Sequence, residues 1–159
     1  MYHSITFVKV ISNNEEEIKN TWDDWHLIPS SEPMFSHPNA VYSYVDVPGA
    51  DGSLDLTDYL IGRPTYSDRQ GTFEFVITNG YDPMESRDFI SKKELRTQLA
   101  NYFNGGIMAA YLEDDPDYFY VGRFFFKGRT PDASHSKVTI EYRVRPYRYS
   151  IDDGEEAGL

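Results

Sequence analysis

The stretch IMAAYLEDDPDYFYVGRFFFK, residues 107–127, decides how the rest of the chain is interpreted. Two apolar and aromatic runs, residues 107–113 and 118–127, flank the tetrapeptide Asp-Asp-Pro-Asp at residues 114–117. Proline presets its own φ angle and an aspartate carboxylate can accept hydrogen bonds from nearby backbone, so this composition is typical of a turn. The pattern therefore predicts a β-hairpin.

Alternating apolar residues predict further strands on both sides of this hairpin. Downstream, residues 137–145 place valine, isoleucine and tyrosine on one face and charged residues on the other, which predicts one buried and one wet face. Upstream, residues 72–78 and 41–47 alternate in the same way. The first dozen residues predict another strand, followed by a hairpin tip or exposed loop at the polar run 13–17.

One helix is expected, and it begins near Ser91. Ser91 and Glu94 match a capping box, in which the two side chains satisfy free backbone N–H groups of the first turn. Gly105 stands where a left-handed C-terminal cap is expected. The apolar stripe that should pack this helix against the sheet consists of Leu95, Leu99, Tyr102 and Phe103.

The remaining segments predict turns and irregular structure. Residues 21–39 are rich in proline, serine and histidine, and we expect Trp22 and Trp25 to anchor this traverse on the core. Gly49 and Gly52 supply positive-φ positions for a tight turn. Many strands, one helix and Gly/Pro turns predict a mainly β (α+β) fold, a β-sandwich or barrel-like domain with one helix laid against it.

Composition bounds the organisation and the chemistry. The 159 residues fit one domain, here residues 1–149, followed by an acidic tail at residues 150–159 that we expect to be disordered. There is no cysteine, which excludes disulfides, thiolate metal sites and a thiol nucleophile. Lys+Arg number 15 and Asp+Glu 26, a net charge of −11 that argues against duplex nucleic-acid binding.

No apolar run approaches the length of a membrane span, about 20 residues. The N-terminus lacks the pattern of a secretory signal, so we expect synthesis and assembly in the cytoplasm.

Two clusters raise the question of catalysis or metal binding. The segment 22–26, Trp-Asp-Asp-Trp-His, has the residue types of a sugar-stacking acid/base site. Adjacent aspartates on extended backbone point to opposite sides, however, so structural anchoring is the stronger interpretation. Asp46, Asp51 and Asp55 offer oxygens without the spacing of a calcium loop, and turn chemistry explains them. We therefore predict no catalytic residue, no metal and no cofactor.

A third cluster is basic. Arg143, Arg145 and Arg148 interleave with tyrosines, a mixture that can bind single-stranded nucleic acid. Because the rest of the chain is acidic, the sequence favours a contact between subunits, in which these arginines meet an acidic loop such as residues 113–117 of a neighbouring copy.

Two segments carry a resemblance to a known family. Residues 20–31, NTWDDWHLIPSS, and residues 46–57, DVPGADGSLDLT, together resemble the N-terminal domain of distal tail proteins of long-tailed phages and prophages of Gram-positive bacteria. Gly-Arg-Pro at 62–64, GTFEF at 71–75 and YVGRF at 120–124 occur in the same order. The candidate family-motif or interface residues are Trp22, Asp23, Trp25, His26, Asp46, Gly49, Asp51, Gly52, Asp55, Arg63, Gly122 and Arg123.

The resemblance implies a virion structural protein. It implies a tail-tube-like β-sandwich with a helix and a protruding hairpin, and a ring of six copies at the distal end of the tail, in the baseplate region. Such a ring joins the tail tube protein to the tail-associated hub and adsorption apparatus, without catalysis and without a membrane, and DNA passes through it only as cargo. If the lumen is acidic, it would repel DNA phosphates.

Two alternatives come from other classes of protein. One is a carbohydrate-binding module for host cell-wall glycans that uses Trp22, Trp25 and tyrosines as stacking platforms. The other is a small hydrolase that uses Asp23, Asp24 and His26.

Overall fold

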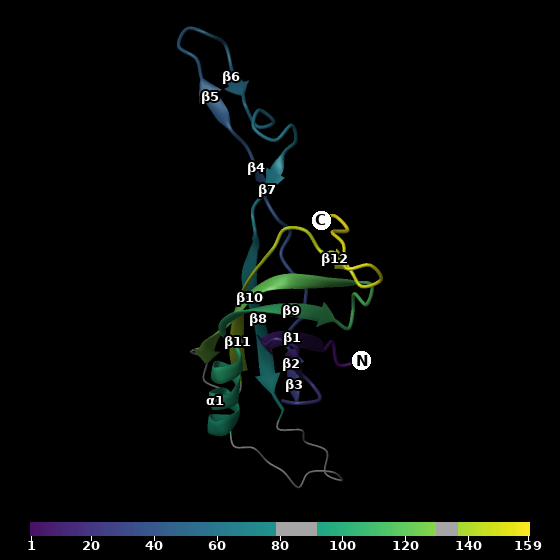
Figure 1. Ribbon diagram of the computed structural model, residues 1–159. Helices are drawn as coiled ribbons and strands as arrows, with labels where there is room; N and C mark the ends of the chain where they lie inside the picture. The colour runs from purple at the N-terminus through teal and green to yellow at the C-terminus, as the bar shows by residue number, and fades with distance from the viewer. Residues whose placement is uncertain (79–91, 130–136) are drawn as a thin grey trace.

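The computed structural model describes residues 1–78, 92–129 and 137–159 (Figure 1). Within these ranges the chain forms short and long β-strands and a single α-helix. The elements are β1 (Ile5–Ser12), β2 (Glu15–Asn20), β3 (Leu27–Pro29), β4 (Ala40–Val41), β5 (Tyr44–Asp46), β6 (Ser53–Asp55), β7 (Thr65–Tyr66), β8 (Arg69–Ile77), α1 (Lys92–Tyr102), β9 (Asn104–Leu112), β10 (Tyr118–Arg129), β11 (Lys137–Val144) and β12 (Tyr149–Ser150).

One antiparallel sheet organises the domain. Its strands follow the order β2-β1-β9-β10-β11-β8-β3, and β12 pairs with β10 off this path. The sheet curls into a half-barrel with the helix against it, which confirms the expected mainly β, barrel-like fold. The hairpin predicted from residues 107–127 is β9 and β10, and its turn is closed by an N–H of Asp115 that donates to the carbonyl of Leu112 at 3.2 Å.

The core lies between the inner face of the sheet and α1. Phe7 of β1 meets Phe103 and Phe124 edge to face, with ring centroids 4.8 and 5.0 Å apart. The predicted helical stripe is confirmed, because its four side chains, Leu95, Leu99, Tyr102 and Phe103, are all buried. Val138, Ile140, Tyr142 and Val144 of β11 are also buried, as their alternation indicated.

The two ends of the helix differ in how they compare with the prediction. Ser91, the expected first residue of the capping box, lies outside the described residues. The helix ends at Tyr102, and Gly105 with φ +88° lies inside β9. The expected helix cap is therefore wrong. Gly105 instead sits where the pairing of β9 with β10 shifts register, and an irregularity of this kind needs a residue that tolerates positive φ.

The C-terminal segment is paired with the domain, in contrast to the disorder expected for residues 150–159. The N–H of Arg148 donates to the carbonyl of Gly158 at 3.0 Å, and the N–H of Ala157 donates to the carbonyl of Arg148 at 2.9 Å. A turn at Gly154, with φ +70°, reverses the chain. Backbone hydrogen bonds supply the order here, and composition carries no signal for them.

Residues 40–66 project from the domain as an arm (Figure 1). A two-stranded sheet of β4 and β7 forms its base, and β5 and β6 form its outer half. This is the protruding hairpin that the family resemblance implied. The single strand expected over 41–47 is divided into β4 and β5, because the backbone between them is held by Ser43, whose N–H donates to Thr57 Oγ1 at 3.1 Å.

Candidate functional site

Nearly half of the large apolar side chains that the described residues leave exposed belong to the arm. Nine of them are between 45% and 89% exposed: Val41, Tyr42, Tyr44, Val45, Val47, Leu54, Tyr59, Leu60 and Ile61. Contiguous exposed apolar surface on a soluble domain marks a site of interaction. The arm is therefore the first candidate functional surface.

The predicted turn residues give the arm a fixed shape. Gly49 and Gly52 have φ angles of +81° and +77°, as the sequence indicated. Asp46 accepts a hydrogen bond from the hydroxyl of Ser53 across the β5–β6 pair. Asp55 accepts from the Thr57 hydroxyl and from the Thr57 N–H at 2.9 Å, and these two hydrogen bonds hold the pKa of Asp55 below its ordinary value.

The remaining motif residues of the arm lie at its tip and its base. Asp51 is exposed at the tip. Arg63 ties the base to the domain, because its Nη1 donates to the hydroxyl of Tyr147 at 2.6 Å. The arm is thus an ordered projection that presents apolar and acidic groups together.

The two tryptophans of the 22–26 segment have different roles. Trp25 is 4% exposed and packs against the rings of Tyr102 and Phe103, each with a centroid distance of 5.4 Å, so its predicted role as an anchor is confirmed. Trp22 is half-buried at the surface, where Tyr2 stacks on it at 3.9 Å and His26 meets it edge-on. The indole of Trp25 is therefore buried in the core, and one face of the Trp22 indole is occupied by Tyr2.

The carboxylates of this segment serve the local backbone. Asp24 Oδ2 accepts from the N–H of Asn20 at 2.7 Å, and Asp23 is exposed on the same turn. His26 adopts φ +52°, and its N–H donates to the carbonyl of Trp22 at 2.8 Å. These contacts describe a structured turn.

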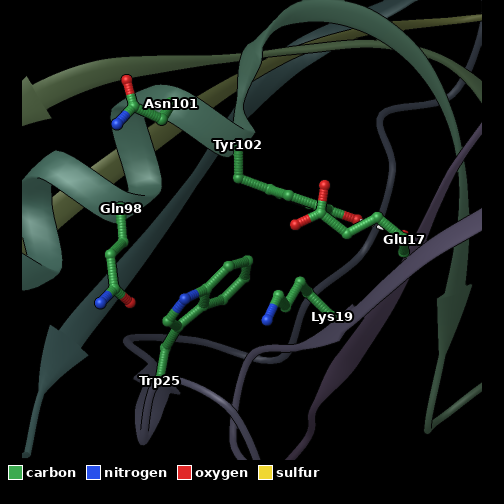
Figure 2. A pocket seen from close by; sticks show the side chains of 6 residues that line it. All are labelled: Glu17, Lys19, Trp25, Gln98, Asn101 and Tyr102. Carbon is green, nitrogen blue, oxygen red and sulfur yellow. Dashed lines mark hydrogen bonds between the residues drawn. The ribbon is translucent and has the colours of Figure 1, made fainter. Parts of the chain in front are cut away.

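A pocket of about 410 Å³ lies between α1 and β2 (Figure 2). Its lining residues are Glu17, Lys19, Trp25, Gln98, Asn101 and Tyr102. Figure 2 shows the indole of Trp25 below the helix and the side chains of Glu17 and Lys19 reaching in from the strand. Of these six residues, the sequence predicts only Trp25 as an anchor and Tyr102 as part of the helical stripe. It does not indicate Glu17 and Lys19, because alternation along β2 gives no sign that side chains on one of its faces line a pocket.

Tyr102 closes the pocket on the side of the core. Its hydroxyl lies 3.0 Å from the carbonyl of Glu17 and 3.1 Å from that of Phe7, and burial raises the pKa of this phenol. The Tyr102 hydroxyl thus holds α1 to the β1–β2 hairpin.

A basic cluster lies on the side of the sheet that faces away from the core. Arg123 of β10 stands directly opposite Arg143 of β11, and Arg145 follows two residues later. A hollow of about 180 Å³ lies among them, with Gly122 in its lining. A Cβ on Gly122 would come 2.3 Å from the carbonyl oxygen of Arg143, so only glycine fits.

Arg148 is used within its own chain. Its guanidinium lies over the ring of Tyr118 at 3.8 Å and is 3.8 Å from Asp115. From the sequence we expect Arg148 to contact the acidic loop 113–117 of a neighbouring copy. In the structure Arg148 instead contacts Asp115 in that loop of its own copy.

The described ranges contain neither a candidate metal centre nor a helix that could span a membrane. Residues 1–78, 92–129 and 137–159 contain no group of three His, Asp or Glu side chains placed to hold a metal ion. In these same ranges the helix is neither long nor apolar enough to cross a membrane.

The fold is similar to that of a phage adsorption-apparatus protein of known structure. No protein-family model and no curated protein matches the chain. Among solved structures, the chain is similar to the Dit protein of phage SPP1, described as a paradigm of the hub adsorption apparatus in phages that infect Gram-positive bacteria. The TM-score is 0.53 at 14% sequence identity.

The likeness covers 92% of this chain and 52% of the SPP1 protein. The chain thus spans about half the length of that protein. At this level of identity the comparison shows a shared fold.

Proposed function

We propose that the protein is a structural component of a phage tail, placed at the distal tip and built from copies of this chain in a ring, six by analogy with the family that the sequence resembles. In this role it joins the tail tube protein to the tail-associated hub. It would assemble in the host cytoplasm and act in the virion. The Dit-like fold supports this proposal.

The observation that carries the proposal is the exposed arm. Burying one large aliphatic or aromatic side chain is worth about 1.5–3 kcal/mol, and nine such side chains are exposed on residues 40–66. An isolated domain gains nothing from this exposure. An assembly in which the arm is covered recovers part of that free energy, so the arm is best explained as a contact to another protein chain.

We also propose that the protein has no enzymatic activity. Asp24 is bound to the backbone of Asn20, and Asp46 and Asp55 are bound within the arm, so these carboxylates have structural partners. The net charge of −11 fits a channel component past which DNA moves without adhering.

A carbohydrate-binding module remains the second candidate. The pocket in Figure 2 favours it, since its lining includes the polar side chains of Gln98, Asn101, Glu17 and Lys19. Stacking geometry argues against it, because Trp25 is buried and Trp22 is covered by Tyr2.

Light scattering coupled to size-exclusion chromatography tests the proposal over a concentration series. We expect a species near six times the monomer mass of 18.4 kDa, with ring-shaped particles in negative-stain images. The variant Leu60→Ser/Ile61→Ser should shift this species to monomer without a change in circular dichroism, because both side chains are exposed. A monomer that binds cell-wall fragments and neither tube nor hub proteins would contradict the proposal and favour the second candidate.

A further inference from the structure

The outer face of the sheet carries a row of residues with a common orientation. Arg123 pairs with Ile107 of β9 on one side and with Arg143 of β11 on the other. Their chain neighbours Met108, Phe124 and Tyr142 are buried, so alternation directs the row away from the core. We call Ile107, Arg123, Phe125, Arg143 and Arg145 the outer basic face.

The charges on the outer basic face are incompletely balanced. Like charges directly opposite each other on paired strands are destabilising, and Arg123 and Arg143 are such a pair. Arg143 contacts Asp68 at 2.8 Å, whereas Arg123 donates to the carbonyl of Gly105 at 3.0 Å and Arg145 to the hydroxyl of Tyr149 at 2.9 Å. The hydrogen bonds of Arg123 and Arg145 thus go to neutral oxygens, and Glu156 adds an electrostatic interaction with Arg145.

Apolar surface adjoins these arginines. Ile107 and Phe125 are each 53% exposed, and the hollow lined by Gly122, Val121 and the arginines lies beside them. Two carboxylates belong to the same face, since Asp68 also lines the hollow and Glu141 pairs with Phe125. The face therefore combines positive charge with apolar contact area, in a chain that has 26 acidic and 15 basic residues.

The arm has the complementary composition. Residues 40–66 contain Asp46, Asp51, Asp55 and Asp58 against Arg63, a net charge of 1 − 4 = −3, together with the nine exposed apolar side chains. Figure 1 shows the arm extending away from the sheet of its own copy. A contact between the arm and an outer basic face thus requires two copies of the chain.

We propose that the arm of one copy docks on the outer basic face of the next copy. In this contact the arm aspartates approach Arg123 and Arg145, and an apolar side chain of the arm occupies the hollow beside Gly122. The two surfaces are different, so the contact is head to tail and leaves a pair of copies with one free arm and one free face. Repetition of such a contact closes into a ring when the rotation between copies permits. The inference rests on the proposed function and names the surfaces that hold the ring together.

Complementary variants test the contact. Arg123→Glu/Arg145→Glu removes the face and leaves the arm intact, whereas Leu60→Ser/Ile61→Ser removes the arm and leaves the face intact. Each variant alone should be monomeric at concentrations where the wild type is assembled. An equimolar mixture should form dimers and stop there, because only one productive contact exists per pair. Lys93→Glu, a single charge reversal on the exposed surface of α1, is the control and should assemble as the wild type does.

A charge exchange makes the test specific. Asp51→Arg/Asp58→Arg, combined in one chain with Arg123→Glu/Arg145→Glu, should restore assembly that either pair of changes abolishes. Dissociation constants come from sedimentation equilibrium, and we expect each double reversal to weaken association at least about tenfold. Thermal melting checks that every variant is folded.

Three outcomes would overturn the contact. They are assembly of Arg123→Glu/Arg145→Glu at the wild-type constant, a mixture that stays monomeric, and a wild type that stays monomeric at every concentration. The proposed function is judged separately, by binding of the wild type to tail tube and hub proteins, so the two can fail independently.

Discussion

Replacing Trp25 by alanine tests whether this indole anchors the segment 21–39 in the core. Trp22→Ala is the matched control, because Trp22 lies at the surface. Trp25 is 4% exposed, and its indole touches the rings of Tyr102 and Phe103. Loss of a buried tryptophan side chain costs about 3–5 kcal/mol of unfolding free energy. Trp22 is half-buried and its main aromatic contact is Tyr2, so its loss should cost about 1–2 kcal/mol.

Urea denaturation monitored by circular dichroism measures both changes in unfolding free energy, and thermal melting measures the corresponding shifts in Tm. A chain of this length loses roughly 2–4 °C in Tm per kcal/mol, so Trp25→Ala should lower Tm by about 6–20 °C and Trp22→Ala by about 2–8 °C. Trp25→Phe keeps an aromatic ring and should recover part of the loss. Equal losses for the two alanine variants, or a larger loss for Trp22, would refute the assignment of Trp25 as the anchor.

Three further predictions concern single positions. Gly122→Ala should lower the unfolding free energy by about 1–3 kcal/mol, because the added Cβ would collide with the β11 backbone. Gly49→Ala has open space around the added Cβ and should lower it by about 1–2 kcal/mol, because the φ angle is positive. Urea denaturation midpoints measure both changes. Thr57→Val should raise the pKa of Asp55 toward 3.8. Wild-type Asp55 contributes stability above its unfolded pKa and loses it as pH falls through the lower folded value, and carboxyl NMR titration of both proteins reports this. Tyr102→Phe should cost about 1 kcal/mol in the same urea assay, and an absorbance titration should show that the variant loses one of the phenols whose pKa lies above the ordinary tyrosine value.

Local pattern was enough to predict the elements that bury one face. Apolar residues recur with the period of a strand in β9, β10 and β11 and with the period of a helix in α1. This periodicity is enough to predict which side chains are buried. Trp25 belongs with them, since its size favours burial.

The features that the hydrophobic pattern does not predict depend on contacts between residues that are distant in sequence. The pairing of residues 156–158 with Arg148 and Tyr149 rests on backbone groups, which composition does not report. Gly105 has the positive φ that the sequence indicated, but only the register of β9 against β10 shows that the angle belongs to a strand irregularity. Likewise, Arg123 stands opposite Arg143 because of the register between β10 and β11. The sequence therefore identifies Arg123 only as a residue of the family motif and does not predict that it belongs to a basic cluster.

The edges of the sheet give a physical reason why assembly should proceed through the arm. A free edge strand can pair with another copy unless charge, proline or shortness prevents it. Edge strand β2 begins with Glu15, Glu16 and Glu17, which would repel the same strand of a second copy. Edge strand β3 has three residues and ends at Pro29, which has no N–H to donate. Both edge strands thus carry features that disfavour strand addition, while the arm leaves its apolar side chains exposed, which favours the proposal that copies of this chain associate through the arm.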